Sequence, residues 1–213
     1  MIKGLIFDLD GVLAFSDKYH YLAWKSIADE EGIYFDEIIN NRLRGVSRME
    51  SLEIILERAN KNYTEEEKVA LATKKNNLYV QYLDELKPSD IYLDTRETLE
   101  YLINKGYKLA IGSSSRNTLK ILEKTDLLKY FIAIVDGNKI KNSKPHPEVF
   151  IKAKDELGLN ENECLVIEDA FSGIDAANSA NIKSVGIGDA KSYSKTVYPI
   201  DKISDLLTIL GEK

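Results

Sequence analysis

Short apolar runs alternate along the chain with stretches whose apolar residues recur at helical spacing. Five runs predict buried strands, at residues 2–7, 108–112, 131–135, 164–167 and 184–187. Amphipathic stretches that predict helices lie between and after them, at about 95–105, 116–125, 147–157, 172–180 and 203–211. Strands that alternate with helices are typical of a parallel sheet covered on both faces. The pattern therefore predicts an α/β fold.

The segment from residue 16 to residue 87 breaks this alternation. It shows no strand pattern, and its apolar residues recur at helical spacing, as at Leu52, Ile55, Leu56 and Ala59. Thr64 opens a helix with the sequence pattern of a capping box. We therefore expect a helical bundle inserted after the first strand. It divides the chain into an α/β core of residues 1–15 and 88–213 and a helical cap of residues 16–87.

Composition limits the classes to which the chain can belong. Its 213 residues are enough for one domain with a smaller insert. With 44% hydrophobic and 30% charged residues, it resembles globular proteins that bury a core. A net charge of −6 argues against a wide basic surface for nucleic acid. No apolar run approaches the roughly 20 residues of a membrane span, so neither nucleic acid nor membrane is an expected partner.

The single cysteine, Cys164, leaves no internal disulfide and favours a reducing compartment. It lies in a predicted buried strand, where we expect it to be a small core residue. The first apolar run ends at Asp8 and is too short for a signal peptide. A cytoplasmic location is the resulting prediction.

Two carboxylates, Asp8 and Asp10, directly follow the first predicted strand. Open α/β sheets place their chemistry beyond the carboxyl ends of the strands. Two acids at this spacing can divide the work, because one can attack phosphorus while the other moves a proton. Gly11 allows the backbone to turn away from the strand. Residues 8–11 alone leave open the alternative that Asp8 and Asp10 are two ordinary solvated aspartates at a strand end.

Residues 113–117 follow the second predicted strand and open a helix. Hydroxyl groups and free backbone N–H groups at a helix N-terminus can bind phosphate. Arg116 adds a fork of donors suited to the same group. The alternative is a serine-rich N-cap with only a structural role.

Two further motifs supply a cation and metal ligands. Lys144 precedes Pro145, which restricts it to an extended backbone and could fix a charge that neutralises a phosphoryl group. Glu168 and Asp169 follow the fourth predicted strand, and carboxylates are ligands suited to Mg²⁺. A loop lysine and an N-capping aspartate are the alternatives. One phosphoryl-transfer site, with Asp8 as its nucleophile, explains all the motifs more simply than separate structural roles do.

In these motifs the chain resembles the haloacid dehalogenase superfamily of phosphatases and mutases over almost its whole length. The resemblance implies a Rossmann-like core with helices on both faces and a helical cap after the first strand. It implies Mg²⁺ as cofactor, held by the Asp8 carboxylate, the Asp10 carbonyl and Asp169, with Glu168 as a direct or supporting ligand. The implied catalytic residues are Asp8, Asp10, Ser113, Lys144, His20 and Lys75.

Residues of the predicted cap indicate which family within the superfamily the chain resembles. Ser16, His20 and Trp24 are spaced to share one helix face. With residues 43–48 and 74–77, they are similar to the β-phosphoglucomutase family. In that family the equivalents of His20 and Lys75 couple closure to proton transfer. The implied substrate-binding set is Ser16, His20, Trp24, Gly45, Val46, Ser47, Arg48, Ser51, Lys75, Ser113, Ser114, Ser115, Arg116, Asn117 and Lys144.

Two phosphate positions follow from this resemblance. Arg48 and residues 115–117 face the phosphate group that is not reacting, whereas Ser113 and Lys144 bind the phosphoryl group that is being transferred. Without the family pattern, His20 could be an interhelical hydrogen-bonding residue, Trp24 plain core packing and residues 45–48 a helix junction.

The implied reaction is the interconversion of β-D-glucose 1-phosphate and D-glucose 6-phosphate through an aspartyl phosphate and glucose 1,6-bisphosphate. These sugar phosphates are the expected partners of a monomer. A sugar-phosphate phosphatase with the same core is the alternative, and a non-catalytic phospho-ligand binding module is a more distant one. Departures from the family pattern are Phe15, Leu93-Asp94, Arg116 for lysine and Ala170 for serine. They bear on cap closure and sugar preference.

Overall fold

Six parallel strands form one sheet in the computed structural model, which describes residues 1–212. The strands are β1 (Gly4–Phe7), β2 (Lys108–Gly112), β3 (Ala133–Val135), β4 (Cys164–Glu168), β5 (Lys183–Gly186) and β6 (Tyr198–Pro199). Their order in the sheet is β3-β2-β1-β4-β5-β6, and every neighbouring pair is parallel. The predicted α/β fold is therefore confirmed, and β1 lies inside the sheet.

Three strands differ from their predictions by more than one residue. β1 begins at Gly4, two residues later than predicted. β3 begins at Ala133, because the chain before it forms a 3₁₀ turn at Leu128–Tyr130 and leaves Ile132 exposed. β6 was not predicted at all. It has two residues at the sheet edge, one of them Pro199, and such a short edge strand lacks the apolar run that marks a buried one.

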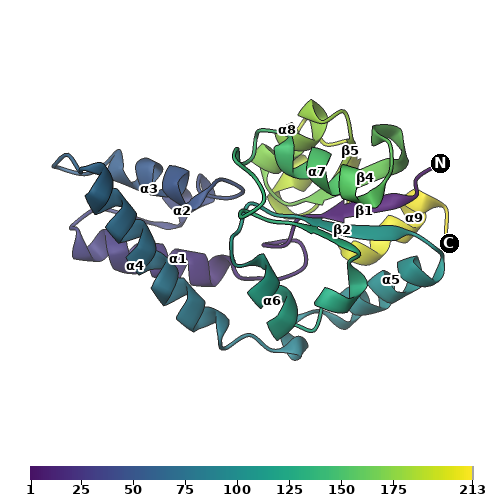
Figure 1. The fold of residues 1–213 in the computed structure, drawn as a ribbon, viewed down its shortest axis with the longest axis horizontal. Coiled ribbons are helices and arrows are strands. Elements are labelled where there is room, and N and C mark those ends of the chain that lie inside the picture. Colours follow the sequence, from purple (N-terminus) through teal and green to yellow (C-terminus); the bar gives the residue numbers. More distant parts are fainter. Residues whose placement is uncertain (213) are drawn as a thin grey trace.

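Helices cover both faces of the sheet (Figure 1). They are α5 (Leu93–Asn104), α6 (Thr118–Lys124), α7 (Glu148–Leu157), α8 (Phe171–Ser179) and α9 (Leu206–Leu210). Successive residues of a strand point to opposite faces, so Ile6 packs with α7 and α8, whereas Leu5 and Phe7 pack with α5, α6 and α9. Because both faces are buried, the strands read as continuous apolar runs rather than alternating ones.

The cap is helical, as predicted. Its helices are α1 (Asp17–Glu30), α2 (Glu37–Asn41), α3 (Arg48–Leu56) and α4 (Glu65–Leu83), and no residue of the fully described range 16–87 lies in a strand. Trp24, Ile27, Leu52 and Ile55 belong to a separate hydrophobic cluster that holds these helices together. The division at residues 15/16 and 87/88 stays a prediction.

The cap lies beyond the sheet on the side where β1 leads into α1 (Figure 1). Two connections join it to the core, one after β1 and one before α5. The rings of Phe15 and Tyr92, one from each connection, meet edge to face with centroids 5.2 Å apart. Among residues 1–212, the helices are all too short or too polar to cross a membrane.

The capping box predicted at Thr64 is present. Its hydroxyl accepts a hydrogen bond from the Glu67 N–H, and the Glu67 carboxylate accepts one from the Thr64 N–H. Thr64→Ala should lower the free energy of unfolding by about 1 kcal/mol, because the Glu67 N–H loses the hydroxyl group that accepts its hydrogen bond. Denaturant unfolding followed by circular dichroism measures the change. Thr73→Ala, an exposed position within the same helix, is the control and should cause no loss.

Candidate active site

The carboxyl ends of three neighbouring strands bring the predicted polar side chains together. Asp8 follows β1, Ser113 follows β2, and Glu168 ends β4 with Asp169 next in the chain. In the sheet β1 lies between β2 and β4, so the strand order reverses at this point. Parallel sheets form their binding sites at such a reversal, beyond the carboxyl ends of the strands.

Lys144 enters this centre from the loop after β3. Its Nζ lies 2.5 Å from Asp8 Oδ1 and also forms an ion pair with Glu168 Oε1. Burial lowers the pKa of Lys144, but the two carboxylates outweigh burial and raise it. Burial raises the pKa of Asp8, and the Lys144 ammonium opposes that rise. The fully buried lysine is therefore a permanent positive charge beside the predicted nucleophile.

Glu168 fixes the loop that follows β4. Its Oε2 accepts hydrogen bonds from the backbone N–H groups of Asp169 and Ala170, both at 2.9 Å, while Oε1 contacts Lys144. The side chain packs directly against Gly173 in α8, where a Cβ atom would overlap the carboxyl group. Gly173 thus leaves the space in which Glu168 lies, and Glu168 holds Asp169 in position.

Carboxylate oxygens of Asp8, Glu168 and Asp169 lie within 4.8 Å of one another, and all three residues are buried. Burial, and then the neighbouring Glu168 charge, raises the pKa of Asp169. Several hard oxygen atoms from three carboxylates gathered so closely fit a divalent cation such as Mg²⁺. The predicted fourth ligand, Asp10, was expected to contribute its carbonyl, and its carboxylate lies outside this cluster.

The Asp10 carboxylate instead accepts a hydrogen bond from the Ser16 hydroxyl at the start of α1. Burial raises the pKa of Asp10 to about 6, although the Ser16 hydrogen bond opposes that change. A carboxyl group with a pKa near neutrality can both donate and accept a proton at physiological pH. The two aspartates of the motif therefore lie in different environments, one beside a lysine and one beside a hydroxyl group.

A cavity of about 560 Å³ lies between the cap and these strand ends. Ser16, Lys144 and Glu168 lie beneath its wall, where they contact Asp10, Asp8 and Asp169. Every other predicted site residue lines it: Asp8, Asp10, His20, Trp24, Gly45, Val46, Ser47, Arg48, Ser51, Lys75, Ser113, Ser114, Ser115, Arg116, Asn117 and Asp169. The fold thus brings the predicted set together, and the role of each residue stays a prediction.

His20 and Lys75 meet on the cap side of the cavity, with His20 Nδ1 2.7 Å from Lys75 Nζ. The ring of His20 stacks on Tyr79, and Lys75 Nζ lies over the rings of Tyr79 and Trp24. Burial, and then the nearby Arg48 charge, lowers the pKa of Lys75 to about 7. Burial and Lys75 lower the pKa of His20. Near neutral pH the His20 ring is therefore uncharged, and Lys75 is the member of the pair that can gain or lose a proton.

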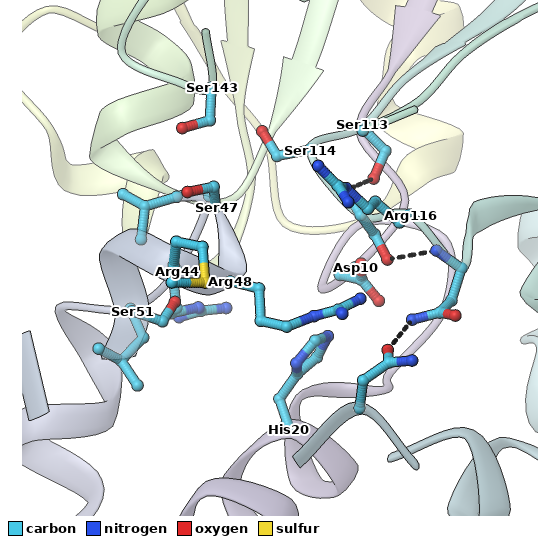
Figure 2. A pocket seen from close by; sticks show the side chains of 18 of the residues that line it. Asp10, His20, Arg44, Ser47, Arg48, Ser51, Ser113, Ser114, Arg116 and Ser143 are labelled. Carbon is cyan, nitrogen blue, oxygen red and sulfur yellow. Dashed lines mark hydrogen bonds between the residues drawn. The ribbon is translucent and has the colours of Figure 1, made fainter. Parts of the chain in front are cut away.

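Arg48 from the cap and Arg116 from the core line the same part of the cavity (Figure 2). Burial and the charge of Arg116 lower the pKa of Arg48. Within residues 1–212 neither guanidinium forms an ion pair with a carboxylate. Ser114 Oγ is buried there without a hydrogen-bond partner in the same range. Two unpaired cations and a free hydroxyl group form a site for an anion.

The cap also contacts the core through side-chain pairs that the sequence did not predict. The Asn117 amide donates to Asn76 Oδ1 at 3.0 Å, which joins α4 to the loop after β2. Arg44 forms ion pairs with Asp17, Asp169 and Asp189. No local pattern marks Arg44, because its partners lie 27, 125 and 145 residues away along the chain.

Comparison with known proteins places the chain among phosphoryl-transfer enzymes. A family model described as haloacid dehalogenase-like hydrolase matches residues 5–187. The chain is 40% identical to β-phosphoglucomutase of Bacillus subtilis, across 100% of this chain and 95% of that one. It is 30% identical to a phosphorylated carbohydrates phosphatase of Thermotoga maritima, across 99% of both. The crystal structure of β-phosphoglucomutase from Clostridium difficile superposes with a TM-score of 0.93 at 41% identity, across 100% and 96%.

Replacing the central lysine tests the electrostatics of this site. Lys144→Met should lower the free energy of unfolding by about 3–5 kcal/mol at pH 8, because two buried carboxylates lose their counter-charge. Without Lys144 the pKa of Asp8 rises further above its unfolded value, so the variant loses stability as pH increases and the deficit shrinks at pH 5.

Denaturant unfolding in metal-free buffer at both pH values measures this deficit. Lys139→Met, which removes an exposed partner of Glu156, is the matched control and should change stability little at either pH. A deficit that is equal at pH 5 and pH 8 would contradict the proposed charge balance.

Proposed function

The chain belongs to the haloacid dehalogenase-like hydrolase family, and we propose that it is a magnesium-dependent mutase that interconverts β-D-glucose 1-phosphate and D-glucose 6-phosphate. One observation carries this proposal. Asp8 and the Arg48–Arg116 pair line the same cavity, so a sugar with two phosphate groups can contact both. The whole-length similarity to β-phosphoglucomutases supports it and identifies an enzyme of this type rather than a non-catalytic binding module.

The proposed reaction begins at Asp8. Its carboxylate attacks the phosphorus of glucose 1,6-bisphosphate or another phosphate donor, and the bond from phosphorus to the sugar oxygen breaks. Lys144 neutralises charge on the transferring group, and Ser113 donates a hydrogen bond to it. When bound, Mg²⁺ held by Asp8, Asp169 and the Asp10 carbonyl, with Glu168 in support, would further stabilise that charge.

Asp10 donates and accepts the proton in the two half-reactions. It protonates the sugar oxygen that leaves in the first half-reaction and accepts the proton of the hydroxyl group that attacks in the second. Its pKa of about 6 suits both steps. Since Ser16 starts the first cap helix, the hydrogen bond between Ser16 and Asp10 connects proton transfer to the position of the cap.

The Arg48–Arg116 pair holds the phosphate group that is not reacting. A mutase must release the bisphosphate in one orientation and bind it again in the other. Each phosphate group then lies in turn beside Asp8 and beside the two arginines. The cap covers the cavity during transfer and excludes water, which favours attack by a sugar hydroxyl group.

A sugar-phosphate phosphatase is the second candidate, and the similarity to the Thermotoga maritima phosphatase favours it specifically. Both activities would use Asp8 in the same way, and they differ in whether water or a sugar accepts the phosphoryl group. The buried, unpaired thiol of Cys164 fits a reducing compartment, so we place either activity in the cytoplasm.

The decisive assay supplies β-glucose 1-phosphate, Mg²⁺ and a trace of glucose 1,6-bisphosphate, and follows glucose 6-phosphate and free phosphate together. A mutase produces glucose 6-phosphate with little free phosphate, whereas free phosphate without isomer shows a phosphatase. Asp8→Asn should abolish both products, because the amide is a poor nucleophile and a poor leaving group. Chelation of Mg²⁺ should suppress both products reversibly.

The distal phosphate site has its own test. Arg48→Ala should lower kcat/KM with glucose 1,6-bisphosphate about 10- to 100-fold, the usual effect of losing a hydrogen-bonded charge. Hydrolysis of p-nitrophenyl phosphate, which has only one phosphate group, should change far less. Arg58→Ala, which removes an arginine that is paired with Glu57 elsewhere on the cap, controls for net charge. Equal losses on the two substrates would argue against a distal site.

A further inference from the structure

Arg44 joins the cap to the core beside the nucleophile. It lies in the loop between α2 and α3, and its guanidinium contacts three carboxylates. Asp17 belongs to the cap and is 3.0 Å from Nη2, whereas Asp189 belongs to the core and is 2.7 Å from Nη1. The third partner, Asp169, is almost fully buried at the end of β4. One cap side chain thus reaches the ends of two neighbouring core strands.

The backbone of the same loop is docked as well. Ser172 at the start of α8 donates a hydrogen bond to the Arg44 carbonyl at 3.0 Å. Gly45, with a φ of +77°, packs against the Ser172 side chain where a Cβ atom would not fit. Arg44 is therefore held by its main chain and its side chain on the same part of the core. Figure 2 shows Arg44 beside Arg48 and Ser47 on the cap side of the cavity.

The charges explain why this contact favours the closed state. Asp17 moves with the cap, so Arg44 keeps one partner when the cap opens and stays oriented toward the core. Opening separates Arg44 from Asp169 and Asp189, and it leaves the buried Asp169 carboxylate without this cation. The carboxylates raise the pKa of Arg44 against the effect of burial, so the cation is stable in this position. Arg44 reaches Asp189 through Nη1 and reaches Asp17 and Asp169 through Nη2. A lysine would have to make all three contacts through its single Nζ atom.

We propose that Arg44 is a positioning residue that selects the acceptor of the phosphoryl group. Its ion pairs with Asp169 and Asp189 keep the cap closed over Asp8 while the phosphoryl group is bound there. In that interval the bond between phosphorus and the Asp8 oxygen breaks, a bond to the acceptor oxygen forms, and the acceptor proton moves to Asp10. A closed cap leaves the sugar hydroxyl group as acceptor, and an opened cap admits water. This inference rests on the proposed mutase function.

Four variants test the proposal. Arg44→Gln removes the charge, Arg44→Lys keeps it without the fork, and Asp189→Asn removes only the exposed core partner. Arg42→Gln is the matched control, because Arg42 lies at the end of α2 and forms its ion pair with Glu57 inside the cap. Thermal unfolding checks that each variant is folded.

The first measurement is the ratio of free phosphate to glucose 6-phosphate in the assay described above. Arg44→Gln should raise this ratio about tenfold or more, because a hydrogen-bonded charge pair contributes roughly that factor to an equilibrium. Arg44→Lys and Asp189→Asn should raise it less, and Arg42→Gln should leave it unchanged. A residue that only stabilises the fold would lower both products without changing their ratio.

The second measurement is hydrogen exchange of backbone amides in residues 43–51 and 170–175, which does not depend on turnover. Arg44→Gln should accelerate exchange in both segments, and Arg42→Gln in neither. Unchanged exchange in Arg44→Gln would overturn the proposal, as would faster exchange with an unchanged product ratio. If the wild-type enzyme releases phosphate but forms no isomer, the mutase function fails. The exchange data then still show whether Arg44 holds the cap closed.

Discussion

The site depends on one buried interaction, the ammonium group of Lys144 between the carboxylates of Asp8 and Glu168. Burying three charged groups is costly unless each has partners, and here every one does. Glu168 also accepts two backbone N–H groups, and Lys144 contacts both acids. The arrangement joins the ends of β1 and β4 with the loop after β3. It gives Asp8 a fixed position and leaves a net negative charge that fits a divalent cation.

The sheet and the place of Asp8 and Asp10 at a strand end could be predicted because the information is local. Buried strands are continuous apolar runs, and the acids follow them directly in the sequence. The helical cap was recognisable for the same reason, since its capping box and apolar spacing are short-range patterns. β6 was missed because two residues at a sheet edge, one of them Pro199, bury too little to leave such a pattern.

The contacts between cap and core could not be predicted in this way. Arg44 is an unremarkable basic residue in the sequence, and only the fold brings Asp169 and Asp189 to it. The same is true of the hydrogen bond between Asn76 and Asn117. Resemblance to a family placed Arg48 and Lys75 in the site, whereas spacing alone left them as ordinary helix residues. Polar residues that follow a buried strand can thus be predicted from the sequence. Contacts between cap and core residues across the cavity can be identified only from the three-dimensional structure.

The cap enters the chain as one uninterrupted stretch between the aspartate motif and α5. Its helices pack around their own hydrophobic cluster, so a change within that stretch need not disturb the sheet. Asp8 and Lys144 can therefore stay constant while the cap residues that line the cavity change. Such an arrangement allows a lineage to acquire new substrates by altering a single exchangeable segment.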